Sequence, residues 1–448
     1  MEALALWGTD WPCLAIQTGR PSVGAFAQQF QSLWVSKSSD ILLHMPLMQQ
    51  YLLQSLQLLQ VLYVLYSYVQ ESKQAMQPTV DVAIVGGGVI GCAIAYHLSK
   101  SGVDVALFDR GEIGAEASST ATGLLAPLGP LSGPGPFADL LLSSFALFPT
   151  LVPELEEASG INLEYEQTGA LRIVRNTKHI SNLLKRINNW QPLGLQMYWL
   201  TGDEARQREP LLAPDVCAAI YAPGESQINA SHVVKSFSLA AMHQGATLYS
   251  HSIITGIQRH NTKVTGVYTS QGDRIACNHL VIANGAWAAH CSEWLHVTIP
   301  IIPQRGQVLT LHQPSTPLRH IIFGEAAYLT PKSKNMIIVG ATKEEVGFNK
   351  NTTVGGISWL LNTAIRLTPA LESCALDQMW AGLRPRTPDN QPILGPASGW
   401  ENVTLAVGHG SVGIMLSAIT GQTIAELIIK GQTPHILQPF SLTRFLIA

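Results

Sequence analysis

One predicted strand, helix, strand unit constrains the fold of this chain more than any other feature. A short run rich in valine and isoleucine, residues 79–85, ends directly at three glycines in G-x-G-x-x-G spacing, Gly86, Gly88 and Gly91. Residues 89–100 then carry apolar side chains at helical spacing, and a second apolar run, 104–108, ends at Asp109. Because this acid stands about 20 residues beyond the glycines, the order predicts a dinucleotide-binding unit.

Each residue type in this unit has a physical task. Gly86 permits a tight turn, Gly88 has no Cβ to block a pyrophosphate, and Gly91 lets helix and strand pack closely. The free N–H groups at the start of the helix face the phosphates, and Asp109 can accept hydrogen bonds from a ribose diol. A glycine-rich turn without a ligand is the alternative. The strand before it, the helix after it and the spacing of the acid favour the dinucleotide.

Composition excludes several classes of partner. The net charge of −3 gives no electrostatic footprint for nucleic acid or an anionic membrane. The six cysteines are scattered without a C-x-x-C pair, which argues against a disulfide framework and against a zinc or other metal site. We therefore expect no metal and a reducing, cytoplasmic compartment. The hydrophobic fraction of 46% is ample for two or three domains in 448 residues.

Residues 1–75 form an N-terminal extension that fits poorly with the rest of the chain. Residues 41–69 are apolar, but Pro46 and repeated glutamines leave no clean run of about 18 apolar residues. An amphipathic or weakly ordered helix is therefore favoured over a membrane span, and membrane contact through 41–69 is not favoured. The segment has no basic start and no small-residue cleavage site, which argues against a secretory signal. Met76 begins a typical soluble dinucleotide-binding sequence, so the extension is also interpreted as an upstream misread or a dispensable segment.

The remaining chain alternates between helical and strand-like patterns and shows no internal repeat. Helical spacing predicts helices at residues 139–159, 181–190, 231–244, 358–367 and 414–430. Strand-like runs lie at residues 247–255, 263–269, 274–283, 303–311, 336–341 and 403–407. Residues 380–395 are interpreted as a loop.

A second glycine-rich turn, GHGSVG, precedes the last predicted helix. Its glycines, Gly408, Gly410 and Gly413, allow the backbone to approach a ligand, and the helix that follows directs its positive dipole end toward that ligand. Residues 114–127 are rich in Ala, Ser, Thr and Gly, so their backbone can also come close to a flat or charged ligand. A turn and a flexible loop without a ligand are the alternatives. The dinucleotide unit upstream favours the ligand interpretation.

These segments, together with HLVIANGAWA, PQRGQVLTL, YLTPKSKNMIIVGAT and WAGLRPRTPDNQPILG, resemble those of the FAD-dependent amino-acid oxidases of the D-amino-acid oxidase superfamily. They are most similar to glycine oxidases of the thiamine-biosynthesis type, from about residue 77 to about 432. The resemblance implies an α/β fold with two discontinuous domains. A Rossmann-like FAD-binding domain takes residues 77–150, 225–300 and 379–435. An α+β substrate domain built on an antiparallel sheet takes residues 151–224 and 301–378.

The resemblance also implies which residues hold FAD. They match family positions at the pyrophosphate, the adenosine ribose, the adenine end and the isoalloxazine. These residues are Gly86, Gly88, Val89, Ile90, Gly91, Asp109, Arg110, Ala117, Ser118, Thr122, Gly123, Leu124, Ile254, His409, Gly410, Ser411, Val412, Gly413, Ile414 and Met415. His409 is interpreted as a turn residue that contacts the backbone rather than as a base.

Two further residues are implied to act on the substrate. In this family Arg384 would hold the substrate carboxylate and Tyr328 would help, which agrees with the fit of a guanidinium to a planar carboxylate. The alternatives are an Arg384 that pairs with Asp389 or a carbonyl, and a Tyr328 that is a core residue. Arg305 and Trp380 are interpreted as structural.

One departure from the glycine oxidase pattern affects the substrate. Those oxidases usually carry an aromatic residue, an arginine and an asparagine in the last turn, where this chain has Gly410, Ser411 and Val412. The missing arginine removes a second cation near the substrate. The GHGS sequence is closer to the pattern of D-amino-acid and N-methyl amino-acid oxidoreductases, so the identity of the amino acid stays open.

The implied reaction passes a hydride from the α-carbon of a small amino acid to flavin N5, after which the imine is hydrolysed and O2 is reduced to H2O2. Three functions remain open. The first is a homo-oligomeric oxidase for glycine or another small amino acid, serving thiamine biosynthesis. The second is a dehydrogenase that passes electrons to a quinone or partner subunit. The third is a non-catalytic flavin-binding subunit, against which the presence of both Arg384 and Tyr328 counts.

Overall fold

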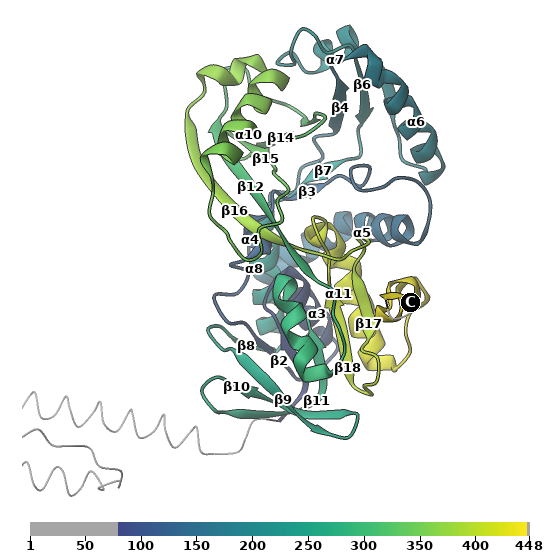
Figure 1. Cartoon of the computed structure of the whole chain (residues 1–448), viewed down its shortest axis with the longest axis vertical. Helices are drawn as coiled ribbons and strands as arrows, with labels where there is room; N and C mark the ends of the chain where they lie inside the picture. The colour runs from purple at the N-terminus through teal and green to yellow at the C-terminus, as the bar shows by residue number, and fades with distance from the viewer. Residues whose placement is uncertain (1–78, 446–448) are drawn as a thin grey trace, which may run out of the picture. The chain divides into compact units, whose positions relative to one another are not determined.

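The computed structural model describes residues 79–445 (Figure 1). Within them, two eight-stranded sheets and the helices that cover them form an α/β fold, as predicted. The expectations for residues 1–75, including the helix at 41–69, lie outside these described residues.

The first sheet contains the parallel unit predicted from the glycine spacing. β1 (Thr79–Val85) pairs in parallel with β2 (Val105–Phe108) on one side and with β11 (Arg274–Ile282) on the other. Beyond β2 lies β8 (Thr247–Tyr249), and beyond β11 lie β18 (Val403–Val407) and β17 (Ile393–Pro396). An antiparallel pair, β9 (Ile254–His260) and β10 (Lys263–Thr269), is attached to β11.

The two faces of this sheet are buried against different layers. Val82 and Ile84 of β1 belong to a core shared with helices, whereas Ala83 and Val85 belong to a separate core on the other face. This alternation follows from the two-residue period of a strand. The helices of the first layer, which contact one another, are α3 (Val89–Lys100), α5 (Pro136–Ser159), α8 (Ala230–His243) and α11 (Gly413–Lys430).

Two of these helices, α5 and α11, are long and apolar enough to cross a membrane by length and composition alone. Both pack within the helical layer, where α11 contacts α3 and α5. The most apolar window of α11 is 67% buried. Its composition is therefore explained by its place in the core.

The second sheet carries the other half of the fold. All of its neighbouring strands pair antiparallel except β13 and β4, which are parallel. Its order is β16 (Leu376–Arg386), β12 (Ile302–His312), β15 (Met336–Gly340), β14 (Tyr328–Lys332), β13 (Ile321–Phe323), β4 (Ala170–Val174), β6 (Ala218–Ala222) and β5 (Tyr198–Thr201). α10 (Val354–Leu367) packs on one face, and α6 (Ile180–Trp190) packs on the other near β4 and β6 (Figure 1).

The loop predicted for residues 380–395 is wrong. The structure has β16 there, followed by a turn and β17. Gly382 and Pro385 weakened the strand pattern in the sequence, but β16 is the edge strand of its sheet and pairs only with β12. A proline is tolerated on an edge strand because its missing N–H leaves no ladder bond broken.

β16 also crosses the predicted domain boundary at residue 379 while pairing entirely within the second sheet. The division into an FAD-binding and a substrate domain stays a prediction. The predicted helix at 358–367 starts earlier, at Val354. The Thr353 side chain accepts a hydrogen bond from the N–H of Gly356 and caps it, a threonine N-cap of the usual kind.

The packing of α3 on the turn before it gives a test of the fold. A Cβ at Gly91 would lie 1.9 Å from the carbonyl oxygen of Gly86, which is backbone and has little freedom to move. We expect Gly91→Ala to lower the free energy of unfolding by about 1–3 kcal/mol or more, measured by urea denaturation. The matched control is Gly355→Ala on α10, where a Cβ meets nothing within 4 Å. Equal stability of the two variants would contradict this packing.

Candidate functional site

A cavity of about 1030 Å³ lies against residues of both sheets. From the first sheet it is lined by the turn between β1 and α3, by the end of β2 and by the start of α11. From the second sheet it is lined by parts of β12, β14 and β16. This volume is at the upper end of the usual range for ligand sites, as an extended ligand requires.

The glycine turn after β1 is shaped as the spacing predicted. Gly86 has a φ of +110°, and a Cβ there would lie 2.5 Å from the carbonyl oxygen of Ala283 on the neighbouring strand. Gly88 lines the cavity, so its missing Cβ leaves the backbone open to a ligand. Gly91 does not line the cavity and serves packing alone. The start of α3 therefore presents backbone to the cavity, at the positive end of its dipole.

Asp109 follows β2 at the cavity wall. Its Oδ2 accepts a hydrogen bond from the N–H of Gly87 at 2.7 Å, and its Oδ1 accepts one from the N–H of Gly111 at 2.9 Å. Burial raises the pKa of Asp109 against the effect of these bonds. Each carboxylate oxygen has a further lone pair, so Asp109 retains the capacity to accept from a ribose diol.

Arg110 lies next to Asp109 but is directed to an aromatic side chain that the sequence did not single out. Its guanidinium carbon is 3.5 Å from the ring centroid of Trp287, and its Nη2 is 2.9 Å from Glu116. Trp287 in turn stacks on Phe348 at 5.5 Å between centroids. Trp287 lines the cavity, and its signal in the sequence was its place just after the Asn284–Gly285 turn that follows β11.

The small-residue segment supplies the next part of the wall. The hydroxyl of Ser118, in the short helix α4 (Ala117–Thr120), accepts a hydrogen bond from the N–H of Val89 at 2.9 Å. Gly123 has a φ of +74°, and a Cβ there would lie 1.8 Å from the carbonyl oxygen of Ile228. Thr122 Oγ1 lies 3.0 Å from the hydroxyl of Tyr328. The segment thus joins the start of α3 to the second sheet.

The turn before α11 brings a second helix start to the cavity. Gly408 and Gly410 have φ values of +78° and +54°, which favour glycine, and the N–H of Gly410 donates to the carbonyl of Pro385 on β16 at 2.9 Å. The first N–H groups of this 18-residue helix have no partner within the helix and lie at the cavity wall. They form a preorganised positive end for a ligand that carries negative charge.

His409 is buried within this turn. Its Nε2 lies 3.2 Å from Thr420 Oγ1, and burial lowers its pKa to about 3. The imidazole is therefore neutral at physiological pH, which agrees with a turn residue and not with a cation that replaces the missing arginine.

Arg384, on the edge strand β16, is one of the cations that the second sheet brings to the cavity. Its Nη1 donates to the carbonyls of Thr342 at 3.0 Å and Arg305 at 3.5 Å, and burial lowers its pKa. No acid among residues 79–445 pairs with it, since Asp389 is paired with Arg444 at 2.7 Å. A guanidinium that is partly removed from water without an acidic partner favours the binding of an anion.

Tyr328 lies beside Arg384 at the start of β14. Both line the cavity, and burial raises the pKa of the Tyr328 hydroxyl. The interpretation of Tyr328 as a mere core residue does not fit this position. All the other residues predicted for the site also line the cavity except Gly91, so the structure brings them together while their individual roles stay predictions.

A buried ion pair near the cavity was missed from the sequence. Arg172 on β4 lines the cavity and donates two hydrogen bonds to Glu225, at 2.5 and 2.8 Å. Both side chains are at most 5% exposed, and the Arg172 guanidinium lies 4.6 Å from the ring of Phe323. Because the partners stand 53 residues apart, no local spacing signals the pair.

The donors and glycines of this cavity fit FAD. Two helix starts, an acid with free lone pairs and a wall of close backbone match the needs of a pyrophosphate, a ribose and a flat ring. Residues 81–427 of this chain match a protein family described as FAD dependent oxidoreductase. The chain belongs to this family. The predicted family resemblance and the FAD cofactor are thereby confirmed.

Several relatives match most of the chain. A glycine oxidase from Geobacillus kaustophilus is 35% identical over 366 residues, which are 81% of this chain and 97% of that protein. A hydrogen cyanide synthase subunit HcnC from Pseudomonas aeruginosa is 30% identical over 83% of this chain and 97% of that protein. A bifunctional protein ThiO/ThiG from Trichormus variabilis is 34% identical over 82% of this chain, which spans only 55% of that protein.

Solved structures agree with these relatives. The crystal structure of glycine oxidase from Geobacillus kaustophilus has a TM-score of 0.79 at 34% identity and covers 82% of this chain and 99% of that one. The glycine oxidase from Bacillus cereus has a TM-score of 0.76 at 35% identity, with 80% and 97% covered. The L-proline dehydrogenase from P. horikoshii, with a TM-score of 0.75, is 23% identical and shows the fold alone.

Gly306 on β12 gives a test of the Arg384 geometry. A Cβ there would lie 2.2 Å from Nη2 of Arg384, so Gly306→Ala must displace the guanidinium. We expect the variant to retain FAD but to bind a small carboxylate such as benzoate about tenfold or more weakly, measured by titration of the flavin absorbance. Gly256→Ala on β9, where a Cβ meets nothing within 4 Å, is the control. Unchanged benzoate affinity in Gly306→Ala would show that Arg384 does not hold the carboxylate.

Proposed function

We propose that this protein is an FAD-dependent oxidase that deaminates glycine or another small amino acid. The observation that carries the proposal is the half-buried Arg384, which has no acidic partner among the described residues and lies in the same cavity as the glycine turns. A bidentate guanidinium is suited to a planar carboxylate. The glycine oxidase relatives support an amino acid as the source of that carboxylate, and O2 as the acceptor.

Each residue of the cavity has a task in this reaction. The turn after β1, Asp109 and the start of α11 would hold the cofactor, and the N–H groups of α11 would stabilise negative charge that develops on it. When bound, FAD would supply the acceptor for the hydride of the α-carbon, with O2 as the final oxidant. Arg384 fixes the carboxylate, so that the α-carbon is held in one orientation.

No side chain in this scheme removes a proton from the α-carbon. His409 is neutral and bonded to Thr420, and the hydroxyl of Tyr328 is bonded to Thr122. Tyr328 therefore orients the substrate through its hydroxyl and excludes water from the site. The substrate amine enters the reaction in its neutral form, and the imine product reacts with water after it leaves the flavin.

The relatives also support a cellular role. The match to bifunctional ThiO/ThiG proteins and the resemblance to glycine oxidases of the thiamine-biosynthesis type favour an imine product used in thiamine synthesis. The five cysteines of the described residues are all free, which supports the reducing, cytoplasmic compartment predicted from the sequence. A homo-oligomer stays a prediction.

The deciding experiment is peroxide production by the purified, FAD-loaded protein against glycine, sarcosine, D-alanine, D-proline and several L-amino acids. Anaerobic bleaching of the flavin is followed in parallel. We expect peroxide with glycine or another small amino acid. Bleaching without peroxide would point to a dehydrogenase with a different acceptor, and no bleaching by any amino acid would refute the proposal.

Removing the guanidinium tests the role of Arg384. We expect Arg384→Ala to lower kcat/KM for the amino acid by about two to three orders of magnitude, because a substrate carboxylate is left without its buried partner. The control is Arg386→Ala, two residues along β16, whose side chain pairs with the exposed Glu345 and does not line the cavity. Similar losses in both variants would indicate damage to the strand and not to the clamp.

The pH dependence of kcat/KM gives a further test. The pKa of His409 is lowered to about 3 and that of Tyr328 is raised above its ordinary value, so neither group titrates between about pH 6 and 9. The rise of kcat/KM with pH therefore reports the loss of a proton from the substrate amine. We expect Tyr328→Phe to keep this rising limb with a lower plateau. Loss of the limb in that variant would assign the titrating proton to Tyr328.

A further inference from the structure

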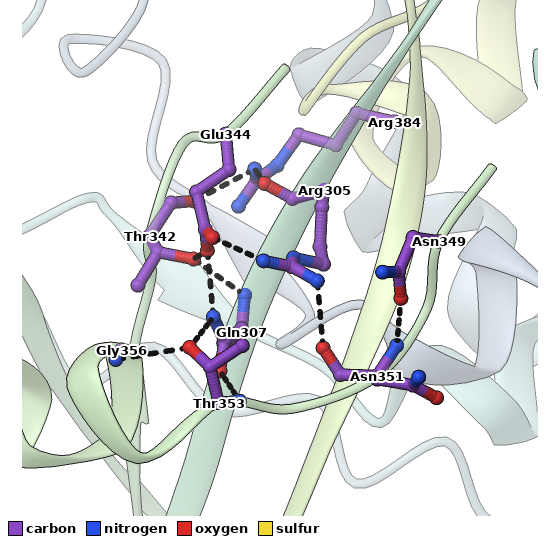
Figure 2. Close-up of polar contacts among 9 residues, drawn as sticks. All are labelled: Arg305, Gln307, Thr342, Glu344, Asn349, Asn351, Thr353, Gly356 and Arg384. Atoms are coloured by element: carbon purple, nitrogen blue, oxygen red, sulfur yellow. Dashed lines mark hydrogen bonds and ion pairs between the residues drawn. The ribbon is translucent and has the colours of Figure 1, made fainter. Parts of the chain in front are cut away.

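A polar cluster lies directly behind Arg384 (Figure 2). It joins β12, the segment after β15 and the start of α10, and its centre is the carboxylate of Glu344. Glu344 does not line the cavity, and the proposed reaction gives it no task. Its carboxylate nevertheless accepts hydrogen bonds from the side chains of Arg305, Gln307 and Thr342.

Both oxygens of the Glu344 carboxylate are bonded. Oε1 accepts from Gln307 Nε2 at 2.7 Å and from Thr342 Oγ1 at 2.5 Å, and Oε2 is paired with the guanidinium of Arg305. Burial opposes ionisation, but the bonds from Arg305, Thr342 and Gln307 outweigh it and lower the pKa of Glu344 to about 2. The side chain therefore carries its charge throughout the physiological range.

The main chain of the same residues is linked as well. The N–H of Arg305 donates to the carbonyl of Glu344 at 2.8 Å, and the N–H of Glu344 donates back to the carbonyl of Arg305 at 3.0 Å. The N–H of Gln307 donates to Thr342 Oγ1 at 2.8 Å, and the N–H of Thr342 donates to the carbonyl of Gln307 at 3.2 Å. These bonds fix Arg305 and Thr342 relative to each other.

Arg305 and Thr342 are the two residues whose carbonyls accept from Nη1 of Arg384. Glu344 holds both of them, one through the guanidinium of Arg305 and the other through the hydroxyl of Thr342. Figure 2 shows the Arg384 guanidinium directed at these carbonyls from the neighbouring strand β16. The position of the guanidinium is thus set by two acceptors that one carboxylate keeps in place.

The cluster is also anchored at its far side, so that it moves as a unit. Gln307 accepts from the N–H of Thr353 at 2.8 Å, and Thr353 caps α10 by accepting from the N–H of Gly356 at 3.2 Å. Arg305 Nη1 donates to the carbonyl of Asn351 at 2.8 Å. Arg305 is only 4% exposed, so loss of Glu344 would leave a buried cation without an acidic partner.

We propose that Glu344 is the positioning residue for Arg384, holding the carbonyls of Arg305 and Thr342 so that the guanidinium presents its free N–H groups to the substrate carboxylate. This inference rests on the proposed function, because it deepens the role of the same site. A bidentate clamp needs such support, since a misplacement of about 1 Å can cost a hundredfold in rate. The sequence-based interpretation of Arg305 as structural therefore gains a functional part, because Arg305 acts on the substrate through Arg384.

The test compares Glu344→Gln with Glu345→Gln in the FAD-loaded protein. Both changes remove one carboxylate from adjacent positions, but Glu345 is 61% exposed and pairs only with Arg386 among the described residues. We expect Glu344→Gln to raise KM for the amino acid and the dissociation constant of benzoate by about tenfold or more, with a smaller change in kcat. Glu345→Gln should resemble the wild type in both.

Crystal structures of the wild type and of Glu344→Gln separate this inference from the proposed function. We expect the Arg384 guanidinium to leave the Thr342 carbonyl in the variant while the strands β12 and β16 stay paired. This displacement would support the positioning role even if the wild type oxidises no amino acid. In that case the proposed oxidase function alone would be refuted. An unmoved Arg384 with unchanged KM and benzoate affinity would overturn the positioning role, whatever the loss of thermal stability.

Discussion

The placement of a half-buried Arg384 without an acidic partner among the described residues is the constraint on which the substrate end of this protein depends. A guanidinium removed from water must recover its lost hydration from fixed acceptors or from an anion. Two carbonyls supply part of this, and the remaining N–H groups lie at the cavity. Gly306 makes the arrangement sterically feasible, because any larger residue would occupy the space of the guanidinium. The geometry therefore leaves a fixed cation at the cavity that can bind an anion, which we propose is the substrate carboxylate.

The second sheet is tied to the helical layer of the first at this point through its edge strand β16. Arg384 and Pro385 are adjacent on β16, where one side chain faces the substrate end and the next carbonyl accepts from Gly410 at the start of α11. Likewise, Tyr328 on β14 touches Thr122 in the segment that bonds to the start of α3. Arg384, the proposed carboxylate clamp, and the two helix starts are thus tied by short covalent and hydrogen-bonded paths. Such ties hold a substrate and a cofactor in one orientation, as hydride transfer requires.

Sequence reasoning recovered the parts of the site that depend on local pattern. The glycines of the turn after β1, the acid after β2 and the glycines before α11 are recognisable because each conformation requires a residue type at a fixed spacing. It failed at β16, where Gly382 and Pro385 conceal an edge strand whose pairing with β12 is visible only in three dimensions. The sequence also left open a pairing of Arg384 with Asp389. In the structure Asp389 pairs instead with Arg444, which stands 55 residues further along the chain. The support given by Glu344 was invisible for the same reason, since its partners Arg305 and Gln307 stand on β12, 39 and 37 residues earlier in the chain.

The cations that line the cavity differ in what they can do to a ligand. Arg110 pairs with Glu116 and Arg172 pairs with Glu225, so the positive charge of each guanidinium is largely neutralised. Arg384 keeps its charge unpaired and its position fixed. Ser411, at a position where the family resemblance implies an arginine, carries no charge, so the proposed orientation of the substrate rests on Arg384. A single clamp sets the plane of the carboxylate but leaves rotation about the bond to the α-carbon free. The walls around Tyr328 and Gly382 must restrict that rotation, so the choice among small amino acids depends on shape more than on charge.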